Sequence, residues 1–147
     1  MHKHILIATD GSELATKAVN HGLELAKQLG AKVTIVTGTE LWSVIEMTRR
    51  SHDSKNPIEA YEQIAKAHAQ EILSEASAIA QKAGMSCETV HMQDLKPAEA
   101  IIAAAEKHGC DLIVLASHSR TGINKFLLGS VASRVLVLST IPVLVYR

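Results

Sequence analysis

Aromatic residues are scarce in this chain of 147 residues, which has one Trp, one Phe and two Tyr. Domains that bind single-stranded nucleic acid by stacking bases need more aromatic side chains than this. An excess of one charge is also lacking, because 15 basic residues balance 15 acidic ones. Without a positive excess there is no general attraction to nucleic acid or to an anionic membrane. We therefore expect no nucleic acid as a partner.

Cysteine pairs and long apolar runs are lacking too. Cys87 and Cys110 are far apart in the sequence and form no CxxC motif, so we expect two small buried side chains instead of a disulfide scaffold. No apolar run approaches the roughly 20 residues that a membrane-spanning helix needs. Asp10 follows the first residue too closely for a secretory signal. These features predict a cytoplasmic protein without membrane insertion.

The chain is expected to form a single α/β domain over residues 1–147, because its length and its 47% hydrophobic content suit one compact core. Short apolar segments, typical of strands buried on both faces, alternate with amphipathic helical patterns. The predicted strands cover 4–8, 32–37, 86–92, 111–116 and 142–146, and the predicted helices cover 13–29, 58–83, 97–108 and 130–139. This alternation predicts a parallel five-stranded sheet with helices on both faces. Its commonest strand order is 3-2-1-4-5, and ligands bind where that order reverses, between the first and fourth strands.

Residues 111–131, DLIVLASHSRTGINKFLLGSV, are the most informative stretch. An apolar run ends in small residues, a polar loop follows, and Gly129-Ser130 opens a helical pattern. Free N–H groups and the positive end of a helix dipole favour a phosphate at such a place. The stretch predicts a phosphate or nucleotide site, although Gly129-Ser130 could also be a plain helix start. The run at 125–128 is interpreted as packing, and His118 as an exposed loop residue.

Two further features allow more than one interpretation. Asp10 follows the first strand, where it could hold a turn or contact a ligand or metal. Residues 40–57 form an unusually long irregular connection, of a kind that is often a lid or a mobile insert.

Several blocks of the sequence resemble the universal stress proteins of the UspA type. They are ILIATDGSELATKAVNHGLELAKQLGAKVTIV, PAEAIIAAAEKHGCDLIVLASHSRTG, LLGSVASRVL and IPVLVYR, in the right order and spacing. The resemblance covers nearly the whole chain, except residues 40–57. It implies a fold of the adenine nucleotide alpha hydrolase-like type. It also implies a homodimer in which the last strand, 142–146, pairs with its counterpart, and a tetramer stays open.

The resemblance also implies a site for ATP or a related adenine nucleotide, with Mg²⁺. ATP-binding members carry G-x2-G-x9-G-[ST], which aligns here as Ala116-x2-Ser119-x9-Gly129-Ser130, so the spacing is kept but two glycines are replaced. A side chain at 119 is strained if that position needs a positive φ. The other implied site residues are Ala8 and Gly38 beside the adenine, Asp10 near the ribose and metal, Leu115 beside the nucleoside, and Arg120 and Val131 beside the phosphates.

Motifs for catalysis are lacking: the chain has no GxSxG, HExxH or GxxxxGK[ST]. We therefore expect a stress-response protein, not an enzyme, that works by nucleotide-dependent interaction. Slow ATP hydrolysis would need a water-positioning residue that the sequence does not identify. The alternative is a member without nucleotide, acting as a dimeric interaction module, for example on a transporter.

Overall fold

The computed structural model contains one parallel sheet of five strands in the order β3-β2-β1-β4-β5, as the sequence predicts. The structure describes residues 1–39, 57–118 and 127–147, without the side chains of residues 57 and 58. Most of the long connection at 40–57 and the loop residues Ser119 and Arg120 therefore lie outside the described residues. The strands are β1 (His4–Ala8), β2 (Lys32–Thr39), β3 (Glu88–Gln93), β4 (Leu112–Ala116) and β5 (Val143–Tyr146).

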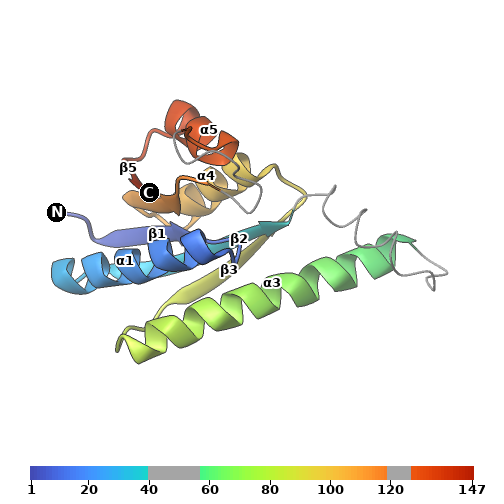
Figure 1. The fold of residues 1–147 in the computed structure, drawn as a ribbon, viewed down its shortest axis with the longest axis horizontal. Helices are drawn as coiled ribbons and strands as arrows, with labels where there is room; N and C mark the ends of the chain where they lie inside the picture. Colours follow the sequence, from blue (N-terminus) through green and yellow to red (C-terminus); the bar gives the residue numbers. More distant parts are fainter. Residues whose placement is uncertain (40–56, 119–126) are drawn as a thin grey trace.

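Among the described residues, four helices flank the sheet: α1 (Glu13–Leu29), α3 (Pro57–Lys82), α4 (Pro97–Lys107) and α5 (Ser130–Leu138). Figure 1 shows α1 and α3 on one face of the sheet and α4 and α5 on the other. The central strands β1 and β4 lie between the two helical layers and are buried on both sides, which explains why they read as continuous apolar runs. The described bounds differ from the predicted ones by one or two residues.

Alternate residues of each strand supply two separate cores. Ile5, Ile7 and Val114 pack under α1 and α3. Leu6 and Ile113 pack under α4 and α5. Because neighbouring side chains of a strand point to opposite faces, a shift of one residue in register would exchange the two sets.

Helix α1 lies unusually close to the sheet, and Gly22 makes the approach possible. A Cβ at this position would stand 2.7 Å from Cδ1 of Ile7 and 3.4 Å from Cγ1 of Val114. Both contacts are with the central strands β1 and β4. The missing side chain therefore allows the helix to pack directly over the pair of strands between which the strand order reverses.

The side of the molecule formed by β5 and α5 carries most of the exposed apolar side chains of the described residues. Every side chain of β5 is half-buried. On α5, Val137 is 81% exposed, and its neighbours Leu136 and Leu138 are exposed as well. The run at 125–128 is interpreted from the sequence as packing, but its two described members, Leu127 and Leu128, are exposed. These two lie just before the first turn of α5.

A polar pair lies beneath α3. Nε2 of His91 on β3 is 2.6 Å from Oγ1 of Thr39 at the end of β2, and the Thr39 side chain is buried. Burial of the imidazole lowers the pKa of His91 below its usual 6.5. The fold therefore favours the neutral ring.

We predict that Gly22→Ala destabilises the protein even though alanine is the better helix former by about 1 kcal/mol. Overpacking a close helix–sheet contact typically costs about 1–3 kcal/mol. In an Ile7→Val background the contacting Cδ1 is gone, so the same replacement should be less destabilising by about 1 kcal/mol. Urea unfolding of the parent, the two single variants and the double variant measures how much the effect of Gly22→Ala depends on Ile7. Equal effects in both backgrounds would show that Ile7 does not limit the approach of α1.

His91 is predicted to make stability fall on acidification. Above its unfolded pKa the ring is neutral in both states and contributes no pH dependence. Below about pH 6.5 the unfolded chain takes up the proton first, so the free energy of unfolding decreases until the folded-state pKa is passed. Urea midpoints at about pH 7.5 and about pH 5.5 should therefore differ less in His91→Gln than in the parent. His68→Gln makes the same replacement on α3 as a comparison. If the pH dependence of stability is the same in His91→Gln as in the parent, His91 is not its cause.

Candidate functional site

The carboxyl ends of all five strands open at one edge of the sheet, because the strands are parallel. At this carboxyl edge β1 ends in Ala8 and β4 in Ala116, and the two strands are direct neighbours. Helices α1, α4 and α5 all begin at this edge, since each follows a strand. Their positive dipole ends therefore converge at the point where the strand order reverses.

Asp10 lies in the turn between β1 and α1. Its Oδ1 accepts the Ser12 N–H at 2.9 Å, and Thr9 Oγ1 accepts the Gly11 N–H at 3.2 Å. Gly11 has a φ of 78°, a conformation that glycine adopts without strain. The interpretation of Asp10 as a turn residue is thus confirmed for one of its carboxylate oxygens. Its half-buried side chain still lies at the carboxyl edge, beside the end of β1.

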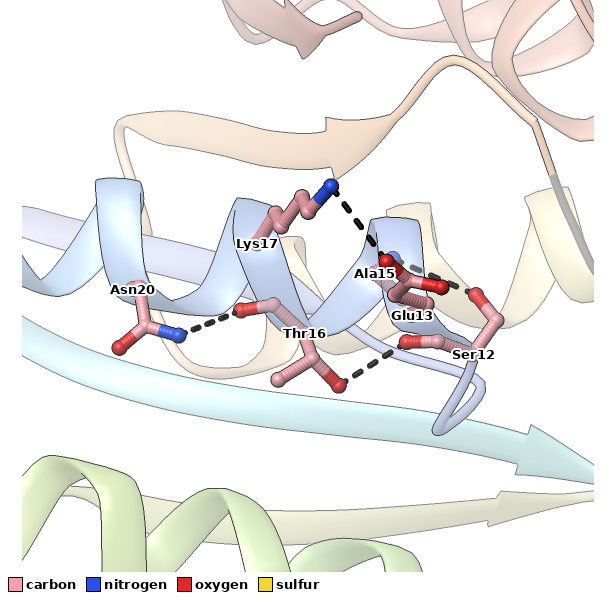
Figure 2. A network of polar contacts seen from close by, with 6 residues as sticks. All are labelled: Ser12, Glu13, Ala15, Thr16, Lys17 and Asn20. Carbon is pink, nitrogen blue, oxygen red and sulfur yellow. Dashed lines mark hydrogen bonds and ion pairs between the residues drawn. The ribbon is translucent and has the colours of Figure 1, made fainter.

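The start of α1 is fixed by the contacts drawn in Figure 2. The Ser12 hydroxyl accepts the Ala15 N–H at 3.3 Å, which confirms Ser12 as the N-cap. The Thr16 hydroxyl donates to the Ser12 carbonyl at 2.9 Å, and Nδ2 of Asn20 donates to the Thr16 carbonyl at 2.9 Å. Glu13 and Lys17 form an exposed pair on the same first turns, which adds little stability. Because Ser12 caps its first turn, the start of α1 is held in position beside Asp10.

The start of α5 is built differently, because its N-cap is Gly129 and has no side chain to offer an oxygen. The Gly129 N–H donates to the Ser117 carbonyl at 2.7 Å. A Cβ at 129 would stand 2.6 Å from that carbonyl oxygen and 3.2 Å from Cα of His118. Glycine is therefore required here by the close approach of two backbone segments, whether or not a ligand binds.

The first turn of α5 carries N–H groups that no N-cap side chain satisfies, beside the exposed Ser130. An ion pair on the surface joins this helix to α4: Nε and Nη2 of Arg134 both donate to Oε1 of Glu99 at 2.9 and 2.7 Å. Hydrogen bonding to Arg134 lowers the pKa of the Glu99 carboxyl. The start of α5 therefore has the features of an anion site: a helix N-terminus, a close backbone turn and an exposed hydroxyl.

The structure brings most of the expected site residues to this edge but places them at different depths. Ala8 and Leu115 are buried in the core under α4 and α5. Ala116 and Val131 are half-buried. Gly38 follows at the end of β2, where a Cβ would come within 3.4 Å of Ala100 on α4. Sequence reasoning missed Ser117, whose only signal was its small size.

The opposite, amino edge of the sheet also has a groove, lined in part by His4, Lys27, Glu88 and His108. Four of its polar side chains have partners within the protein. Nδ1 of His108 is 3.6 Å from Glu88, Nε2 of His4 is 2.8 Å from Thr34, and Nζ of Lys27 donates to the Ala83 carbonyl. These contacts join the end of α4 to β3, β1 to β2, and α1 to the end of α3, so these side chains have a structural role.

Within residues 1–39, 57–118 and 127–147, no group of three His, Cys, Asp or Glu side chains could hold a metal ion by itself. None of the helices in these ranges is both long and apolar enough to cross a membrane.

Known proteins resemble this chain along its whole length. "Universal stress protein YxiE" of Bacillus subtilis is 32% identical over 149 residues, covering 100% of both chains. The solved structure of the "hypothetical protein MJ0577" of Methanocaldococcus jannaschii has a TM-score of 0.78 and 26% identity, and covers 99% of this chain and 96% of that one. A universal stress protein solved in complex with cAMP has a TM-score of 0.68 and 26% identity, with 99% and 97% coverage.

These likenesses confirm the predicted fold class, because the similar structures share the adenine nucleotide alpha hydrolase-like arrangement. The universal stress protein family also matches residues 1–147 of the sequence. From this match and from the relatives with full coverage, we conclude that the chain belongs to the universal stress protein family.

Proposed function

We propose that this protein binds ATP or a related adenine nucleotide at the carboxyl edge of the sheet and acts in the cytoplasmic stress response through nucleotide-dependent interaction. The observation that carries the proposal is the start of α5, where Gly129 lies against Ser117 and leaves the first N–H groups of the helix without a side-chain cap. This feature lies beside the β1/β4 switch point, where ligands of open parallel sheets bind. A related chain of similar fold was solved with cAMP, which supports an adenine nucleotide as the ligand class.

The mechanism is recognition, and we do not propose an enzymatic reaction. The N–H groups of Ser130 and Val131 would donate to phosphate oxygens, and the α5 dipole would favour their charge. Ser119 and Arg120 would extend this contact from the loop before α5. Mg²⁺, when bound with the nucleotide, would neutralise phosphate charge, with Asp10 supplying a carboxylate oxygen.

The adenosine half would lie against the strand ends. Ala8, Gly38 and Leu115 come from three different strands at the same edge, and Ala8 and Leu115 belong to the apolar core there, so the adenine would meet main-chain atoms and apolar side chains. Ala116 would lie between the two halves, at the end of β4. An apolar surface with a few polar groups at its rim is the usual form of a small-ligand site.

A second candidate function is a dimeric interaction module that works without nucleotide. It is favoured by Ala116 and Ser119, which replace glycines of the family's ATP motif, and by the exposed apolar side chains of α5. In either case we propose a homodimer through residues 142–146. A half-buried apolar edge strand would otherwise be a liability.

The proposal is tested by the variant Ser130→Asp. An acidic residue in the first turn of a helix favours the helix dipole, so the protein should remain at least as stable. The same charge repels phosphate at close range, so the dissociation constant for Mg·ATP should rise about tenfold or more. Calorimetric titration with Mg·ATP and with adenosine measures both affinities, and adenosine should bind equally to the parent and the variant.

The matched control is Ser74→Asp, which places the same charge at an exposed position of α3 on the other face of the sheet. It should leave the Mg·ATP affinity unchanged. The parent protein, denatured after purification, should release material with the ultraviolet absorbance of adenine. If the parent binds neither ATP nor AMP at millimolar concentration, the nucleotide proposal fails and the second candidate remains.

A separate prediction concerns the replaced glycine of the motif. Ser119→Gly should tighten Mg·ATP binding by about fivefold or more if the bound loop needs a positive φ, which costs an L-residue about 1 kcal/mol or more. Ser119→Ala separates the two properties of serine, because it removes the hydroxyl and keeps the Cβ. A gain with Gly and none with Ala assigns the effect to backbone conformation. A loss with both would instead assign a hydrogen bond to the Ser119 hydroxyl.

A further inference from the structure

The peptide group of Ser117 is hydrogen-bonded on both sides, to two segments that are distant in the sequence. Its N–H donates to the Tyr146 carbonyl at 2.7 Å, and its carbonyl accepts the Gly129 N–H at 2.7 Å. The residue is 1% exposed, and its Oγ lies 2.7 Å from Nδ1 of His118. Ser117 therefore joins the end of β5 directly to the start of α5.

The hydrogen bonds of β5 show which of its groups face outward. The carbonyls of Pro142 and Tyr146 accept N–H groups from β4, at Ile113 and Ser117. Backbone groups of a strand alternate in direction, so those of residues 142, 144 and 146 point to β4. The N–H and carbonyl groups of Val143 and Val145 therefore point away from the sheet, along the edge where a further strand would pair.

The surface around this edge fits a second copy of the chain. Residues 141–146, IPVLVY, contain no charged side chain, so two copies would meet without repulsion between like charges. Leu136, Val137 and Leu138 on α5 add exposed apolar surface next to the strand in sequence. The end of β5 is also tied to α1, because the rings of Tyr146 and His21 are 5.4 Å apart.

We infer that pairing of β5 with a second copy and nucleotide binding at the start of α5 strengthen one another through the Ser117 peptide group. The inference rests on the proposed function. A four-residue strand at a sheet edge frays easily. Pairing its outer groups with a second copy keeps the Tyr146 carbonyl in position to accept the Ser117 N–H. The Ser117 carbonyl is then in position to accept the Gly129 N–H. The ligand then finds the helix start already ordered, and by linkage the bound ligand favours the dimer equally.

The first experiment uses the unmodified protein with Mg·ATP. Sedimentation equilibrium gives the dimer dissociation constant with and without saturating Mg·ATP, and we expect a decrease of about fivefold or more. Fluorescence titration with a labelled ATP at protein concentrations below and above that constant should show a matching gain in affinity. Amide hydrogen exchange at Ser117 and Gly129 should slow on dimer formation alone.

The second experiment uses Val145→Pro. Proline removes an N–H that points outward, so the bonds between β4 and β5 remain while pairing with a second copy loses a donor. The variant should be a folded monomer that binds Mg·ATP about fivefold or more weakly at every concentration. Val145→Thr is the matched control, since it keeps the N–H and the branched shape, and it should behave as the parent does.

The outcomes separate the inference from the proposed function. Absence of Mg·ATP binding in the parent overturns both. Binding that is equally tight in monomer and dimer, with an unchanged dimer constant, overturns the coupling and leaves the nucleotide site standing. A parent that stays monomeric at all concentrations overturns the coupling as well. If Val145→Pro does not fold, the titrations of the parent at protein concentrations below and above its dimer dissociation constant still test the coupling.

Discussion

The hydrogen bond from the Gly129 N–H to the Ser117 carbonyl determines how the carboxyl edge is arranged. It brings the first turn of α5 back to the end of β4, across the loop that separates them. Because a Cβ at 129 would collide with the same carbonyl, the bond also explains why this position is glycine. This one contact places the start of α5 at the edge, together with its uncapped N–H groups and the exposed Ser130.

The role of this glycine changes how the family's nucleotide motif is understood. Gly129 has a backbone reason to be glycine in the fold of this chain, so its presence alone does not argue for a ligand. The proposed nucleotide binding therefore depends on Ser130 and on the residues at 116 and 119. Of these, Ser130 is exposed at the helix start, and Ala116 is half-buried at the end of β4.

The sequence predicted the features that depend on residues close together in the chain. The apolar runs predicted the strands, and the helical patterns predicted α1, α3, α4 and α5 to within two residues at each end. The strand order followed from the alternation of elements. The contacts of Ser117 with Tyr146, His91 with Thr39 and Arg134 with Glu99 could not be predicted, since each joins residues that only the packed sheet brings together. The exposure of Leu127 and Leu128 was missed for the same reason.

The close contact of α1 with the sheet at Gly22 makes the two sides of the carboxyl edge unequal. On the β1 side, α1 packs against Ile7 and Val114 with no room for a side chain at Gly22. On the β4 side, the two hydrogen bonds of Ser117 join the start of α5 to the sheet. Under the proposed function, the entropy lost on binding would fall mainly on the phosphate side, and ligands that share a nucleoside would differ there in how tightly they bind.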